Sequence, residues 1–146
     1  MVDLNIDFTS EQQGEPIIEA SVFCTLQIEG EHNWPECPYE EVSYLRSPHR
    51  HVFHVKAVAA VDHNNRDVEF ILLKHNILEY LNQCYYNKER RIHVFGSKSC
   101  EMIASELLVA FNLQQVEVNE DGENGAIVRC VPNQEVSSCC GGDCGC

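Results

Sequence analysis

Two histidines spaced two residues apart, His49 and His51 in Pro-His-Arg-His, are the residues best suited to chemistry. In a β-strand, side chains two apart share a face and lie roughly 6.6 Å apart along the backbone, so both imidazoles can reach one metal ion. Pro48 suits the first position of such a strand. Catalytic zinc takes three protein ligands and keeps its fourth position open. The pattern therefore predicts a zinc site whose third ligand comes from elsewhere.

His32 is the best candidate for the third ligand, because it follows directly after a predicted strand. A hairpin between that strand and the next one would bring His32 beside His49. His54 lies on the opposite face of its strand and is not expected to bind the ion. The alternative is that His49 and His51 are only exposed on a strand face and bind no metal. A third histidine at a strand end favours the metal site.

Nine cysteines divide into a scattered group and a terminal group. Their odd number, without a secretory signal, argues against a disulfide framework. Four of them crowd the last eight residues, with glycines between them, as Cys139, Cys140, Cys144 and Cys146. Thiolates bind zinc or Cu(I) well, so this tail is a candidate for metal binding or redox capture. The equal alternative is that its cysteines stay reduced and have no function. The scattered five are expected to be mostly small buried hydrophobic residues: Cys24, Cys37, Cys84, Cys100 and Cys130.

Hydrophobic periodicity predicts the elements that must position these side chains. Three prolines predict a long loop over residues 33–48. The second predicted helix begins with Ser99 at the N-cap position and carries a regular apolar stripe. Short additional strands can form at residues 3–8 and 92–95. The main elements are strands at 17–29 and 51–61, helices at 72–84 and 99–112, and strands at 116–119 and 126–131.

This order of strand, strand, helix, helix, strand, strand predicts an α+β domain. We expect a four-stranded antiparallel sheet with both helices on one face. The length of 146 residues suits a single domain, expected over residues 17–131. A polar N-terminal segment, residues 1–16, precedes it. A cysteine-rich tail, residues 132–146, follows it and is expected to be disordered.

Composition and charge exclude several classes of partner. The formal net charge is -13, which repels phosphate backbones and anionic membranes, so neither nucleic acid nor a membrane is an expected partner. No apolar run approaches the ~20 residues of a membrane span. The acidic and polar amino terminus does not resemble a signal peptide. A cytoplasmic location is therefore expected.

Five short motifs, in this order, resemble the 6-pyruvoyltetrahydropterin synthase and 6-carboxytetrahydropterin synthase family, whose members share the tunnelling (T) fold. The motifs cover about residues 17–131, and the family places its zinc ligands, its two helix starts and a late strand in the same sequence. They are His32 in Glu-His-Asn-Trp-Pro, His-Arg-His-Val-Phe at 49–53, Val-Glu-Phe-Ile-Leu-Leu-Lys at 68–74, Ser-Cys-Glu-Met-Ile-Ala at 99–104 and Val-Glu-Val-Asn-Glu-Asp at 116–121.

The resemblance implies that His32, His49 and His51 hold zinc. It also implies that Glu120 anchors the ring of the ligand, since a carboxylate can accept two parallel hydrogen bonds from an N–H and an amino group. The ligand would be a pterin- or purine-like small molecule. Family members form trimers, often stacked into hexamers, so a homo-oligomer is expected.

The sequence departs from the family at its proton-transfer residues. The family's catalytic cysteine precedes the paired histidines, where this chain has Tyr-Leu-Arg-Ser, and its Asp-His pair near the end of the first helix is missing. Arg50 replaces the small glycine between the two histidines. Cys37, His75 and His93 are the remaining candidates for a base or nucleophile, and none of them stands at a family position.

Two functions follow from this pattern. The first is a zinc-dependent enzyme with lyase or isomerase chemistry on a dihydropterin triphosphate or a related purine-like compound. The alternative is a non-catalytic zinc protein of the same fold that binds a pterin- or purine-like ligand, which the missing thiol and Asp-His pair favour. In a third possibility, zinc only stabilises the fold.

Overall fold

The structure is a computed structural model, and it describes residues 18–131. The strand expected at residues 3–8, the N-terminal segment and the cysteine-rich tail lie outside the described residues. In chain order the elements are β1 (Ser21–His32), the 3₁₀ helix η1 (Glu40–Arg46), β2 (His49–Ala60), α1 (Phe70–Tyr85), β3 (Tyr86–Asn87), β4 (Ile92–Gly96), α2 (Cys100–Ala110), β5 (Gln115–Glu120) and β6 (Asn124–Arg129).

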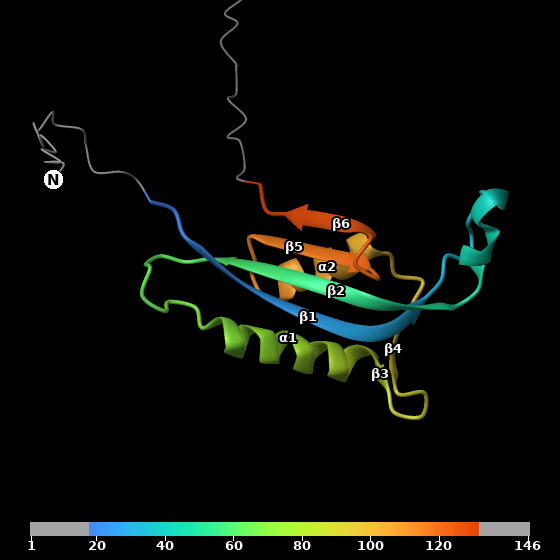
Figure 1. The fold of residues 1–146 in the computed structure, drawn as a ribbon, viewed down its shortest axis with the longest axis horizontal. Coiled ribbons are helices and arrows are strands. Elements are labelled where there is room, and N and C mark those ends of the chain that lie inside the picture. Colours follow the sequence, from blue (N-terminus) through green and yellow to red (C-terminus); the bar gives the residue numbers. More distant parts are fainter. Residues whose placement is uncertain (1–17, 132–146) are drawn as a thin grey trace, which may run out of the picture.

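Six strands form one mixed sheet in the order β3-β4-β1-β2-β5-β6 (Figure 1). The long strands β1 and β2 pair antiparallel over twelve residues at its centre. β5 adds antiparallel to β2, and β6 adds antiparallel to β5. β4 pairs with β1 in parallel, over Gly30 to His32 only.

The expectation of a four-stranded antiparallel T-fold sheet with the order ββααββ is wrong. Over residues 18–131 the sheet has six strands and includes a parallel pair, and three helices accompany it. β3 is only two residues long and lies in a polar segment, so no alternating pattern marks it. The partner of β4 depends on where α1 returns the chain, which local periodicity does not encode.

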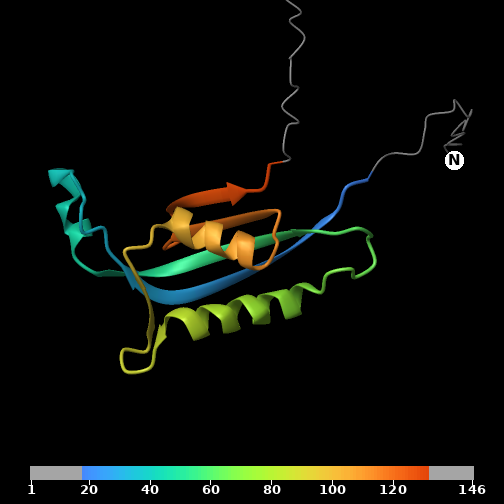
Figure 2. The ribbon, with the colours of Figure 1, turned by 180° about the vertical axis from the view of Figure 1, so that it is seen from behind.

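One face of the sheet carries the hydrophobic core. Alternate residues of β1, β2 and β5 are buried, while their neighbours are exposed in β1 and partly or fully exposed in β2 and β5. Both α-helices pack on the buried face, as Figure 2 shows from behind, with α2 against β5 and β6 and α1 against β1. Helical spacing explains which side chains they bury: Leu73, Ile77 and Leu81 from α1, and Cys100, Ile103, Ala104 and Leu107 from α2.

Side-chain caps set the starts of both α-helices. Glu69 accepts a hydrogen bond from the backbone N–H of Leu72, and Ser99 accepts one from that of Met102. The cap on α2 matches the position expected from the sequence. It holds the segment before α2 in place, and that segment borders the site described below.

The long loop between β1 and β2 is folded back on itself. It contains η1, which has no buried residue of its own. Backbone N–H of Trp34 donates to the carbonyl of Leu45 at 2.6 Å, and the guanidinium of Arg46 donates to the carbonyl of Cys37 at 2.9 Å. The loop therefore holds Trp34 in a defined place at the end of the sheet. No helix in residues 18–131 is long and apolar enough to cross a membrane.

Candidate metal centre

Strand register brings three histidines together at one end of the sheet. In the antiparallel pair of β1 and β2, His32 stands directly opposite His49, and His51 stands opposite Gly30. All three therefore share the face that further along the sheet forms the core. One nitrogen from each ring lies within 4.8 Å of the others, so His32, His49 and His51 can hold a metal ion. This confirms the predicted hairpin between His32 and His49.

Each histidine uses its Nδ1 atom for a hydrogen bond to a fixed oxygen. Such a bond places the proton on Nδ1, and in His49 and His51 it leaves the lone pair of Nε2 free for a metal. Two of the acceptors are backbone carbonyls and the third is a carboxylate. The pairs are His32 with the carbonyl of Lys98 at 2.9 Å, His49 with the carbonyl of Ser47 at 2.8 Å, and His51 with Oδ2 of Asp121 at 2.6 Å.

The Nε2 atoms of His49 and His51 are buried and have no hydrogen-bond partner. A buried polar atom without a partner carries a desolvation cost of about 1–3 kcal/mol, so it calls for an explanation. A cation bound at the point where these nitrogens converge would supply the missing partner. The donor set, three imidazole nitrogens, suits zinc among other transition metals.

Beneath the histidines lies an aromatic layer that keeps their rings in place. The ring of Phe53 packs edge-on against His32 and His51, with centroids 5.2 and 5.9 Å away. The ring of Phe95 also packs against Phe53, with the two centroids 5.0 Å apart. A glycine at position 30 makes this possible, because a Cβ atom there would lie 2.8 Å from the Phe95 ring.

Glu120 completes the cluster from β5, where it pairs with Phe53 across the sheet. Its Oε1 lies 3.0 Å from Nε2 of His32, and its Oε2 lies 3.4 Å from Nε2 of His51. Contact with the His32 imidazole holds the pKa of Glu120 below its ordinary value. Burial opposes protonation of His32, yet Glu120 and the carbonyl of Lys98 raise the pKa of that imidazole. The carboxylate is thus ionised and close enough to share a cation or a ligand.

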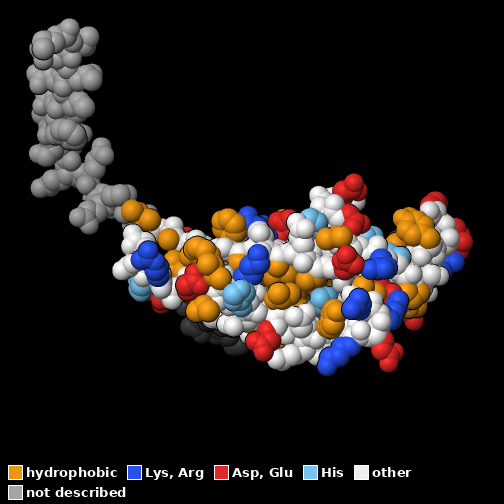
Figure 3. Space-filling model, turned by 60° about the horizontal axis from the view of Figure 1, so that its bottom comes forward, with side chains coloured by type: hydrophobic (Ala, Val, Ile, Leu, Met, Phe, Trp, Pro, Cys, Tyr) orange, Lys and Arg blue, Asp and Glu red, His pale blue; other side chains and the backbone are white. Residues whose placement is uncertain are grey.

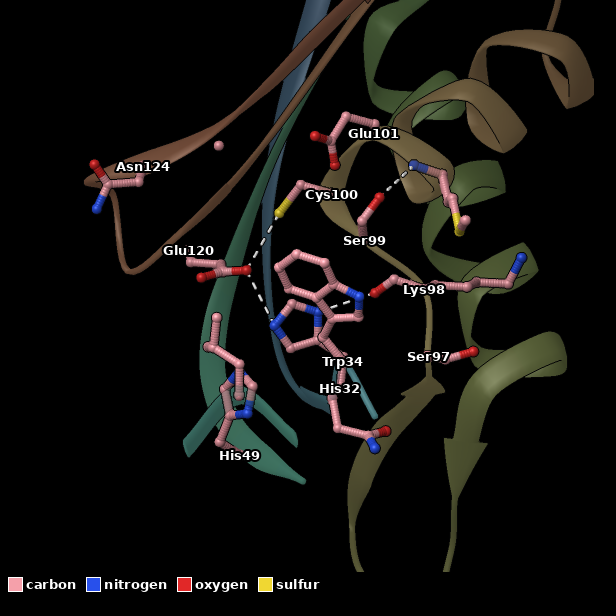
Figure 4. A pocket seen from close by; sticks show the side chains of 14 residues that line it. His32, Trp34, His49, Ser97, Lys98, Ser99, Cys100, Glu101, Glu120 and Asn124 are labelled. Carbon is pink, nitrogen blue, oxygen red and sulfur yellow. Dashed lines mark hydrogen bonds and ion pairs between the residues drawn. The ribbon is translucent and has the colours of Figure 1, made fainter. Parts of the chain in front are cut away.

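A cavity of about 470 Å³ opens beside the histidines (Figure 4). His32, His49 and Glu120 form one part of its wall. The start of α2 and the segment before it form another part of the wall. Trp34 forms a third part. A cation on the histidines would therefore face a space large enough for a small organic molecule.

Cys100 borders this cavity, although its sequence pattern predicts only a small buried hydrophobic residue. Its thiol lies 3.5 Å from Oε1 of Glu120. Burial, together with the neighbouring carboxylate, raises the pKa of the Cys100 thiol to about 12. The group is therefore a neutral hydrogen-bond donor and not a thiolate nucleophile. The sequence signal that could have placed Cys100 at the site is its position in Ser-Cys-Glu, at the start of a predicted helix.

The proposed catalytic residues Cys37 and His75 are not part of the cavity wall. Cys37 is 3% exposed, and its thiol points to the carbonyls of Tyr39 and Val42 within the loop. His75 lies exposed on α1. His93 is buried elsewhere, with its ring nitrogens near the carbonyl of Glu29 and the side-chain oxygen of Asn82. Within residues 18–131, the structure does not bring these three groups to the histidine cluster.

Arg50, between the two β2 histidines, projects to the other face of the sheet. Its guanidinium pairs with Glu29 at 2.7 Å and is mostly exposed. The side chain therefore does not crowd the cavity.

A search against family models found no match for this chain, and a comparison with curated proteins also found none.

Proposed function

We propose that the chain holds a zinc ion on His32, His49 and His51 and acts on a pterin- or purine-like compound bound in the adjoining cavity. The observation that carries this proposal is the convergence of one nitrogen from each of three imidazoles beside a cavity of about 470 Å³, with the buried Nε2 atoms of two of them left without a partner. Structural zinc sites are closed by four protein ligands, whereas catalytic sites leave a position open to the substrate. An open side toward a cavity supports the second kind.

Each group at the site has a defined task in this proposal. Bound zinc would act as a Lewis acid that polarises a carbonyl or hydroxyl oxygen of the ligand. Glu120, ionised and at the cavity wall, would accept hydrogen bonds from N–H groups at the edge of the ring. Hydrogen bonds at Nδ1 would keep the three imidazoles oriented while the ligand exchanges.

A non-catalytic binding protein is the second candidate. It is favoured by the neutral thiol of Cys100 and by the positions of Cys37 and His75 away from the cavity. In that case the same zinc and carboxylate would hold the ring without turning it over. The two candidates share the metal centre and differ only in turnover.

The five motifs that resemble the pterin synthase family support the ligand class in both candidates. The same resemblance supports a homo-oligomer. A cytoplasmic location belongs to the proposal as well, because the described cysteines are free and such thiols persist in a reducing compartment. These are Cys24, Cys37, Cys84, Cys100 and Cys130.

Zinc stoichiometry is the first test, measured on a chain whose four tail cysteines are changed to serine, so that thiolates do not contribute. We expect one zinc per chain. Replacing His49 and His51 with alanine should abolish it, because a single imidazole does not hold zinc. The matched control replaces His63 and His75, two exposed histidines outside the cluster, and should keep the zinc.

Turnover then separates the two candidates. Zinc-loaded protein is incubated with dihydroneopterin and with its triphosphate, and products are followed by chromatography. Zinc-dependent conversion of either compound supports the enzyme, while ring binding without conversion supports the binding protein. Zinc retained by the His49→Ala and His51→Ala double variant would show that the metal centre is assigned wrongly.

A further inference from the structure

The cavity has an aromatic wall that is already in place. Trp34 lines it, and this residue is 45% exposed. Its backbone is tied at both sides, by N–H to the carbonyl of Leu45 at 2.6 Å and by the carbonyl from N–H of Cys37 at 3.1 Å. Tyr39 packs against the indole edge, with ring centroids 6.0 Å apart. A rigid, half-exposed indole at a cavity offers its face to a planar ring.

Negative groups line the same cavity. Glu120 and Glu101 both border it, and Figure 4 shows them on its wall together with Cys100. Both carboxyl groups are negatively charged at neutral pH, because the ordinary pKa of a glutamate lies far below that pH. Carboxylates accept hydrogen bonds and cannot donate them, so they suit the N–H edge of a heteroaromatic ring and repel an anionic group.

Within residues 18–131, the cavity has no free lysine or arginine side chain for phosphate groups. Among residues 18–131, Lys98 is the one lysine or arginine that lines it. Its ammonium group pairs with Glu106 at 2.8 Å, and the side chain extends away from His32 and Glu120 in Figure 4. A polyphosphate carries several negative charges, and it would meet the carboxylates without a counter-charge from the described chain other than the metal centre.

The N-terminus of α2 is the other feature that commonly holds phosphate. Here Glu101 already places a carboxylate in the first turn of α2, where a hydrogen bond with Ser99 lowers the pKa of that group. Ser99 also caps the N–H of Met102. The positive end of the α2 dipole is therefore already compensated by the carboxylate of Glu101.

We infer that the cavity selects an unphosphorylated planar heteroaromatic ring, stacked on Trp34 with its N–H edge toward the carboxylates. This inference rests on the proposed function, since the ring lies beside the metal centre. It narrows the ligand class: the resemblance implies a pterin triphosphate, whereas the charges on the cavity wall disfavour the triphosphate group.

Intrinsic fluorescence gives a direct test, because Trp34 is the only tryptophan of the chain. Zinc-loaded full-length protein is titrated with guanosine and GTP, and with neopterin and neopterin triphosphate. Quenching, corrected for ligand absorbance, reports contact with the indole, and equilibrium dialysis gives the affinities. We expect quenching by both unphosphorylated compounds and binding about tenfold or more weaker for each triphosphate, as like charges oppose it. Equal or tighter binding of the triphosphates would overturn the inference.

Variants of Trp34 separate stacking from simple proximity. Trp34→Leu should weaken binding of guanosine and neopterin roughly tenfold by dialysis, within the range for removing one base-stacking aromatic. Trp34→Phe should restore most of that loss. Phe70→Leu, at an exposed aromatic residue of α1 that does not line the cavity, is the matched control and should bind normally. Unchanged affinity in Trp34→Leu contradicts the stacking.

Zinc content, measured on the same samples, keeps the two proposals apart. If zinc binds to the three histidines and neither unphosphorylated ring binds, the inference is wrong while the metal centre stands. If the rings bind in a Trp34-dependent way but the histidines do not hold zinc, the inference stands and the proposed function is wrong.

Discussion

At the scale of single residues, Asp121 does two tasks with one carboxylate. Its Oδ2 accepts from Nδ1 of His51 at 2.6 Å, and its Oδ1 accepts from the backbone N–H of Val52 at 2.8 Å. The residue is held in the left-handed region, with φ of 56°, directly after β5. Aspartate tolerates that conformation better than most residues do. The hydrogen bond from His51 holds the pKa of Asp121 below its ordinary value.

Replacing Asp121 with asparagine should therefore weaken zinc binding with little effect on folding. If the amide oxygen keeps the N–H of Val52, the amide NH₂ faces His51 and requires an acceptor at Nδ1. The imidazole proton then moves to Nε2, the atom that faces the metal. We expect the zinc dissociation constant to rise by about 10–100-fold, measured by competition with a chelator in the tail-serine background.

Asp62→Asn is the control for this change, since Asp62 lies on an exposed turn away from the cluster. Its zinc affinity should equal that of the parent chain. Nitrogen NMR of the imidazoles would report the tautomer of His51 directly. An Asp121→Asn protein with parental zinc affinity would show that the carboxylate does not orient this histidine.

At the scale of elements, a carboxylate on α2 ties together both helices and the segment before α2. Glu106 accepts from the hydroxyls of Tyr80 and Tyr85, both on α1, at 2.8 and 2.5 Å. It also pairs with the ammonium group of Lys98 at 2.8 Å. We call Glu106 and these three partners the Glu106 clamp. Since the carbonyl of Lys98 accepts from Nδ1 of His32, the clamp connects the helix pair to the metal centre.

Glu106→Gln should lower the free energy of unfolding by about 1–3 kcal/mol at neutral pH, because a partly buried charged acceptor is lost. Burial alone would raise the pKa of Glu106, but hydrogen bonds from Lys98, Tyr85 and Tyr80 lower it below 4.5. The clamp therefore stabilises the fold fully above that ordinary value, and its contribution is lost as the pH falls through the lowered one.

Urea unfolding at a series of pH values measures both effects. The Glu106→Gln protein should be less stable at neutral pH and should lose less stability than the parent on acidification. Glu79→Gln, an exposed residue of α1, serves as the control and should behave like the parent. Identical acid dependence in Glu106→Gln and the parent would argue against the clamp.

At the scale of the whole molecule, the sheet formed by residues 18–131 has two open edges. β4 covers only the last three residues of β1, so the outer edge of residues 21–29 has no strand partner within the described chain. Among the strands that the structure describes, β6 pairs with β5 alone. Hydrophobic side chains of Phe70, Ile71 and Leu72 are exposed on α1, and Figure 3 turns this side forward to show hydrophobic groups interrupted by charges. Open edges of this kind are surfaces for pairing with another chain.

Because the two open edges differ, pairing of β1 in one copy with β6 in the next would be head-to-tail. Contacts of that type close into rings when the rotation allows it. We predict a trimer or a hexamer, the number of copies following from the family resemblance. Analytical ultracentrifugation over a range of micromolar concentrations should give a single species of that mass. A monomer throughout the range would contradict the prediction.

The sequence by itself was sufficient for features that depend on local pattern. Period-two alternation located β1 and β2, and helical spacing with a capping serine located α2, with ends shifted by a few residues. The His-x-His spacing indicated that two imidazoles share a face. The order of the first two strands was enough to place His32 beside His49, since consecutive strands joined in antiparallel fashion meet at their loop ends.

Only the tertiary structure decided what depends on residues distant in sequence. The parallel pairing of β4 with β1 requires the path of the chain through α1, and no local pattern encodes it. The same holds for the cavity: Trp34, Cys100 and Glu120 come from a loop, a helix start and a strand end that meet only after packing. Tertiary packing determines which charges surround the site and how far the indole of Trp34 is exposed. Burial and electrostatic energy depend on distance in space and not on spacing along the chain.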